Sequence, residues 1–271
     1  MNATLFKHEI LRTWRWLALL ALAAVLVVGA AVLMAATLPT FLSSTFAVIA
    51  IVVAAVYPFA VQLLISLDFY RSSYSKTGYF TAAIPEKGST IFGVKALYAY
   101  LVSLLAIVLD LGLLLLAAIG FGMTVGTGPA ETMRTISAGL DVFWQLPAWL
   151  VVAFFVIVAF LPLVGITPFF FAATVGSESW INRNGFGGVV LVWFLFYVAN
   201  QILGVAAVFL APALDLNHLP EVSLMFDPVA LATAGNDAQY LPLGIFAWML
   251  LIGVVGMWWA KVSYSRKLEL R

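Results

Sequence analysis

The residues from Asp68 to Lys95, DFYRSSYSKTGYFTAAIPEKGSTIFGVK, form the longest polar stretch between two long apolar blocks. Glycine and proline at Gly78, Pro85 and Gly88 indicate turns, and Ser89 and Thr90 are placed to cap a new helix. Its basic residues outnumber its acidic ones, with Arg71, Lys76, Lys87 and Lys95 against Asp68 and Glu86. Because Lys and Arg collect in cytoplasmic loops, the stretch predicts a structured loop on the inner side of a membrane.

The composition indicates an all-α membrane protein. Of the 271 residues, 64% are hydrophobic and 9% are charged, whereas soluble domains carry about 25% charged residues. The net charge of +1 argues against a nucleic-acid partner. The absence of cysteine excludes disulfides and thiolate metal sites, and the two histidines, His8 and His218, are too far apart in sequence to suggest a metal site.

Six apolar stretches are long enough to span a bilayer, which needs about 20 residues. They cover residues 17–38, 46–67, 96–123, 148–174, 187–211 and 241–260. We therefore expect one transmembrane domain over residues 1–271. Residues 1–16 carry Phe6, Ile10 and Trp14 on one helical stripe, which predicts an amphipathic helix in the headgroup layer. The alternative is a basic flank that only orients the first span.

The distribution of cations predicts that both termini are cytoplasmic. With the N-terminus inside, Arg134 is the one cation on the outer side. The other twelve of the thirteen Lys and Arg are then on the inner side, as the positive-inside rule requires: Lys7, Arg12, Arg15, Arg71, Lys76, Lys87, Lys95, Arg183, Lys261, Arg266, Lys267 and Arg271. The outer loops are expected to carry short surface helices at Ala130–Trp144 and Pro228–Thr233.

Three polar residues inside the spans are candidates for a substrate path. Asp110 lies deep in the third span, and Asn200 and Gln201 lie at nearly the same depth in the fifth. A charged residue at mid-membrane is costly, so Asp110 is expected to face a partner or water. The alternative is one interhelical hydrogen bond with Asp110 neutral.

The sequence lacks the motifs of a nucleotide-hydrolysing or other catalytic chain. A phosphate-binding loop reads GxxxxGK[ST], and the nearest string, Glu86 to Thr90, has its Lys and Gly in the wrong order. No GxSxG elbow or HExxH pair occurs either. The chain is therefore not expected to be an enzyme.

The stretch GYFTAAIPEKGSTIFGVKALYAYL resembles the inner loop of bacterial type-2 ABC exporter permeases. Within that class it is similar to the six-span permeases that export lantibiotic or bacitracin-type antimicrobial peptides. The match rests on Gly78-Tyr79-Phe80, Ile84-Pro85 and Lys95. The opening LFKHEILRTWRW and the ending SYSRKLELR also resemble this family, although Glu269 stands where the family usually has Asn.

The resemblance implies a permease in the bacterial cell membrane, working with a second permease copy or paralogue, membrane lipid and two ABC ATPase subunits that bind Mg-ATP. Residues 1–16 would be the elbow helix, residues 71–90 the main coupling helix and residues 175–186 a smaller contact. The implied ATPase-coupling residues are Arg71, Tyr74, Ser75, Lys76, Tyr79, Glu178 and Arg183. The alternative to an ATPase contact for the tyrosines is that they form an aromatic belt at the membrane interface.

We therefore expect an ATP-driven exporter subunit for an amphiphilic or peptide-like substrate. The alternative is a membrane transporter that needs no ATPase, or a membrane assembly or scaffold protein.

Overall fold

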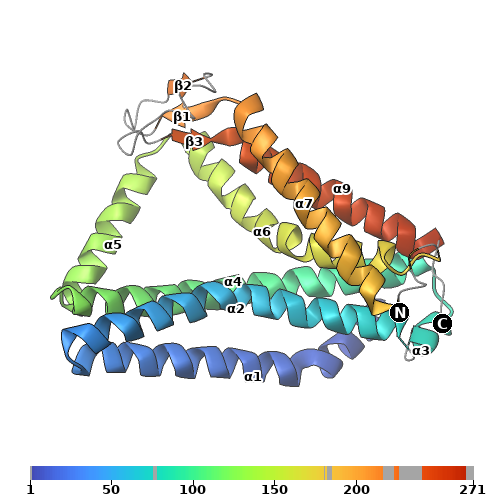
Figure 1. Ribbon diagram of the computed structural model, residues 1–271, viewed down its shortest axis with the longest axis horizontal. Helices are drawn as coiled ribbons and strands as arrows, with labels where there is room; N and C mark the ends of the chain where they lie inside the picture. Colours follow the sequence, from blue (N-terminus) through green and yellow to red (C-terminus); the bar gives the residue numbers. More distant parts are fainter. Residues whose placement is uncertain are drawn as a thin grey trace. The chain divides into compact units, whose positions relative to one another are not determined.

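The computed structural model describes residues 2–75, 78–179, 181, 185–215, 223–225 and 240–266. It confirms an all-α membrane fold, because six helices in the described ranges are long and apolar enough to cross a membrane. Each predicted span overlaps one of them (Figure 1). They are α1 (Asn2–Thr37), α2 (Thr40–Tyr74), α4 (Gly88–Thr124), α6 (Ala148–Val175), α7 (Phe186–Leu210) and α9 (Leu243–Arg266). The chain is a multi-pass membrane protein.

The chain divides into two compact units. Unit one comprises Met1–Arg71 and Thr90–Phe143, and unit two comprises Ser72–Ser89 and Trp144–Arg271. The single transmembrane domain expected over residues 1–271 stays a prediction.

Small side chains line the seams between the helices of unit one, where α1, α2 and α4 run alongside one another (Figure 1). On α1, Ala24, Val28, Ala31 and Ala35 are buried at alternating steps of four and three residues. Since lipid supplies no hydrophobic force between helices, small residues stabilise them by allowing close approach. The same spacing on α4 places its buried stripe at Ala99, Ser103, Ala106, Leu113 and Ala117.

The N-terminal segment differs from the prediction of a separate interfacial helix. Helix α1 is continuous from Asn2 to Thr37, with no boundary near residue 16. Ala and Leu, which favour helix, are frequent after Trp16, and neither Gly nor Pro occurs before Gly29. Residues 2–16 and the first predicted span are therefore one helix.

The segment between α2 and α4 is not one continuous helix over residues 71–90, so the predicted single helix is wrong, whereas the coupling role of the segment stays a prediction. Helix α2 continues to Tyr74, the short helix α3 covers Gly78–Ala82, and α4 begins at Gly88. Pro85 explains the break, since it lacks an N–H and disfavours helical geometry in the residue before it. Ser89 and Thr90 lie inside the first turn of α4 rather than before it.

The predicted surface helix at Ala130–Trp144 is confirmed as α5 (Pro129–Trp144), on which no residue is buried. The loop after α7 contains a three-stranded antiparallel sheet, which the sequence analysis missed. Its order is β2-β1-β3, with Leu214 paired to Leu224 and to Leu241. The strands are β1 (Ala213–Asp215), β2 (Ser223–Met225) and β3 (Tyr240–Pro242). The predicted helix at Pro228–Thr233 lies outside the described residues.

Unit two is built on close packing of α6 and α9. A Cβ added to Gly253 of α9 would lie 3.2 Å from Val164 Cγ2, and one added to Gly256 would lie 2.5 Å from Thr167 Cγ2. Thr167 also donates a hydrogen bond of 3.3 Å to the carbonyl of Gly253. The absence of side chains at these two glycines therefore allows the helix backbones to approach closely.

Candidate functional site

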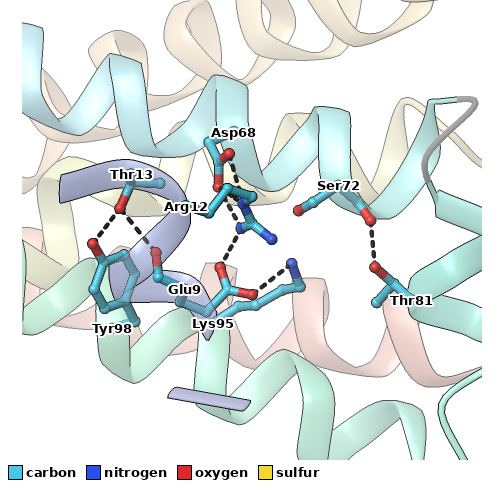
Figure 2. A network of polar contacts seen from close by, with 8 residues as sticks. All are labelled: Glu9, Arg12, Thr13, Asp68, Ser72, Thr81, Lys95 and Tyr98. Carbon is cyan, nitrogen blue, oxygen red and sulfur yellow. Dashed lines mark hydrogen bonds and ion pairs between the residues drawn. The ribbon is translucent and has the colours of Figure 1, made fainter. Parts of the chain in front are cut away.

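A cluster of four charged side chains joins three helices of unit one (Figure 2). Arg12 of α1 donates from Nε to both carboxylate oxygens of Asp68 on α2, at 2.9 and 3.0 Å. Arg12 also pairs with Glu9 one turn earlier on α1. Lys95 of α4 lies 3.1 Å from Glu9, measured from Nζ to Oε1. The cluster contains two acids and two bases and is therefore neutral.

The two ends of this network differ in their exposure to solvent. The side chains of Lys95 and Glu9 are 4% and 11% exposed, whereas that of Arg12 is 36% exposed. An ion pair that is hidden from water depends strongly on both partners, because removing one leaves an uncompensated buried charge. The Glu9–Lys95 pair is therefore the part of the cluster most sensitive to substitution.

A second set of contacts fixes the same face of α1 against α4. The hydroxyl of Thr13 hydrogen-bonds that of Tyr98 and donates to the carbonyl of Glu9 (Figure 2). The ring of Phe6 meets the ring of Tyr98 edge to face, with centroids 5.6 Å apart. The polar residues Glu9, Arg12 and Thr13 thus contact protein, although the sequence analysis placed residues 1–16 at the membrane surface.

In unit two, the connector formed by residues 72–89 packs on the end of α9. The ring of Tyr74 meets that of Tyr264 edge to face at 5.9 Å. Thr81 donates a hydrogen bond of 2.7 Å to the carbonyl of Ser72 across the connector (Figure 2). At the far end of the connector, a Cβ on Gly88 would lie 3.5 Å from the backbone of Ser265. The described residues of the connector, 72–75 and 78–89, are therefore a folded part of unit two.

The connector between α6 and α7 reaches the same turn of α9. Glu178 is 4% exposed, and its Oε1 accepts a hydrogen bond of 2.8 Å from Ser263 Oγ. Both connectors that the family resemblance assigns to ATPase coupling thus contact neighbouring residues of α9, Ser263 and Tyr264.

The predicted coupling residues therefore have different surroundings. Tyr79 is 52% exposed, Arg71 is exposed, and Tyr74 and Ser75 are half-buried. Glu178 is buried, so its part in coupling would be to hold the connector on α9 and not to touch a partner directly. Lys76 and Arg183 lie outside the described residues.

The three predicted substrate-path residues are divided between the units. Asp110 lies on α4 of unit one, and its buried Oδ1 has no hydrogen-bond partner among the described residues. In unit two, Asn200 on α7 accepts a hydrogen bond of 2.8 Å from Nε1 of Trp248 on α9. Gln201, its neighbour, is exposed.

Glu9, Thr13 and Tyr98 are site residues that the sequence analysis missed. Glu9 is the one acidic residue among the cations of residues 1–16, which was a usable signal because a buried carboxylate requires a cation nearby.

Comparisons with models of protein families, with curated proteins and with solved structures found no match for this chain. The resemblance to type-2 ABC exporter permeases therefore stays a prediction.

Proposed function

We propose that this chain is the transmembrane subunit of an ATP-driven ABC exporter for an amphiphilic or peptide-like substrate. In this proposal the chain lies in a bacterial cell membrane with both termini in the cytoplasm. A separate ATPase subunit hydrolyses Mg-ATP, and a second permease copy or paralogue completes the transporter.

The observation that carries the proposal is the packing of the residue 72–89 connector on α9. Tyr74 and Gly88 contact Tyr264 and Ser265 near the two ends of the connector, while Tyr79 between them exposes an aromatic ring. An exposed tyrosine on a folded segment suits a protein interface. A displacement of this connector would move the joined ends of α2, α4 and α9 together, as rigid-body coupling requires.

The test is isolation of the full chain from its native membrane in mild detergent, followed by mass spectrometry and an ATP hydrolysis assay. We expect an ATPase chain to co-purify, with hydrolysis that depends on it. Reversal of charge at Arg71 and Lys76 together should release that chain, whereas Arg134→Glu on α5 should not. Active transport by a particle without any ATP-hydrolysing chain would refute the proposal.

Asp110 favours a second candidate, a transporter without an ATPase. A buried carboxylate oxygen that has no hydrogen-bond partner in the described part of the chain is a group that can take up a proton or contact a substrate. Transport that persists without ATP and stops when the proton gradient is collapsed would favour this candidate.

A further inference from the structure

An apolar groove of about 670 Å³ runs along one side of unit one. Its wall on α1 includes Phe6, Ile10 and Trp14, its wall on α4 includes Leu101 and Leu105, and Tyr57 and Val61 of α2 contribute to the lining. The volume is typical of a site for a small ligand. The walls remain open, since Ile10, Trp14 and Leu105 are 41%, 49% and 67% exposed.

The groove has the length of a lipid chain. Its lining on α1 extends from Phe6 to Ala21, which is about 22 Å at a rise of 1.5 Å per residue. One leaflet of the hydrocarbon core is about 15 Å thick. The groove can therefore take one acyl chain and continue toward the headgroup layer.

The charge beside the groove is positive. The guanidinium of Arg15 lies 5.7 Å from the ring centroid of Trp14, which itself lines the groove. Lys7 follows the lining residue Phe6, and both Lys7 and Arg15 are exposed. The acids in this region, Glu9 and Asp68, are already paired with Lys95 and Arg12.

The charges of Glu9, Arg12, Asp68 and Lys95 balance within their cluster, so Lys7 and Arg15 are not neutralised by it. Within the described residues, neither Lys7 nor Arg15 forms an ion pair. An apolar slot beside exposed cations suits a ligand with a hydrocarbon chain and an anionic head.

We propose that this groove is a binding site for one anionic phospholipid. One acyl chain lies between α1 and α4, and Arg15 and Lys7 bind the phosphate. The site depends on the chain being in a membrane and not on the presence of an ATPase, so its failure would leave the proposed function standing.

The test is native mass spectrometry of the full chain after delipidation, titrated with phosphatidylglycerol or phosphatidylcholine of the same acyl composition. We expect one tightly held phosphatidylglycerol per chain and weaker binding of phosphatidylcholine. Arg15→Gln should weaken phosphatidylglycerol binding about fivefold, the effect of one basic residue near an anionic headgroup. Phosphatidylcholine binding should fall less in this variant, because its choline group already compensates the charge of the phosphate.

Two further variants separate the groove from the general membrane surface. Ala18→Phe places a large ring in the groove lining and should abolish tight binding of both lipids. Lys261→Gln removes an exposed cation of α9 in unit two and should change nothing. Equal affinity for the two lipids, unchanged binding in Arg15→Gln, or an equal loss in Lys261→Gln would overturn the proposal.

Discussion

Lys95 and Glu9 form a nearly solvent-free ion pair that ties the start of α4 to the N-terminal part of α1, with Nζ 3.1 Å from Oε1. The two residues are 86 positions apart in the chain. The pair fixes a segment that composition alone would place at the membrane surface. Because each charge is compensated by the other, the helix junction depends on both being present.

The first prediction concerns the loss of one charge from this pair. Lys95→Met leaves Glu9 with Arg12, which is already shared with Asp68, and gives the cluster a net charge of −1. We expect the free energy of unfolding in detergent to fall by about 3 kcal/mol, the low end of the cost of breaking a buried pair, because Glu9 keeps only a partner that it shares with Asp68. Denaturant unfolding followed by circular dichroism measures it.

The matched control for this prediction is the double variant Glu9→Gln with Lys95→Met. It removes both charges and leaves the Arg12–Asp68 pair intact, so it should be more stable than Lys95→Met alone. Each single variant, Lys95→Met and Glu9→Gln, is measured as well. If the loss of stability in the double variant equalled the sum of the two single losses, the charges would not act as a pair.

The second prediction concerns the exposed side of the same cluster. Asp68→Asn removes the acid that Arg12 contacts on α2, but Arg12 keeps Glu9 as a partner. Since this side is partly open to solvent, we expect a loss of at most about 1 kcal/mol. The same unfolding assay measures it, and a loss as large as that of Lys95→Met would contradict the difference in burial.

The spans could be predicted because they depend on local composition. An apolar run such as residues 148–174 must be in lipid or in a core, whatever its partners are. The helix at Ala130–Trp144 was equally local, since Pro129 suits the first helical position and Glu131 suits the first turn.

The pairing of distant residues could not be predicted in this way. Nothing in the sequence near Glu9 specifies Lys95 rather than another cation, because the choice depends on how α1 and α4 pack. Similarly, β1 is only three residues long, and its partners lie beyond gaps of seven and 24 residues (216–222 and 216–239). Such a short strand gives no periodic signal, so the sheet was missed.

The third prediction separates attachment of an ATPase from transmission of its motion, and it depends on the proposed function. Tyr264→Ala removes the edge contact with Tyr74 that holds the connector on α9. We expect transport to fall severalfold while an ATPase still co-purifies and hydrolyses ATP. Tyr79→Ala, which changes an exposed ring, should instead weaken co-purification.

The outcome that contradicts this prediction is a reversal of the two phenotypes. If Tyr264→Ala released the ATPase and Tyr79→Ala retained it, the exposed ring of Tyr79 would not be the contact. Co-purification measures attachment of the ATPase. Transport and ATP hydrolysis are measured in the same reconstituted vesicles.

The fourth prediction concerns Asp110. Asp110→Asn keeps the shape of the side chain and removes its charge, so we expect normal abundance in the membrane and reduced transport. Ser103→Ala is the control, since Ser103 lies on the buried stripe of α4 seven residues before Asp110. Normal transport at normal abundance in Asp110→Asn would remove Asp110 from the mechanism.

The fifth prediction concerns the close approach at the end of α6. A Cβ on Gly176 would lie 2.5 Å from the carbonyl oxygen of Ala172 and 2.6 Å from Cα of Val189, both of which are backbone atoms. The backbone of Gly176 is helical, with φ of −66°, so space and not conformation requires glycine there. Because backbone cannot move aside as a side chain can, Gly176→Ala should cost about 1–3 kcal/mol of stability.

The control for Gly176 is Gly29 in the middle of α1, where an added Cβ would have no neighbour within 4 Å. Gly29→Ala should be neutral or slightly stabilising, since alanine favours helix more than glycine does. Thermal unfolding of both variants in the same detergent gives the comparison. If Gly176→Ala were as stable as Gly29→Ala, α6 and the start of α7 would not pack with their backbones in contact.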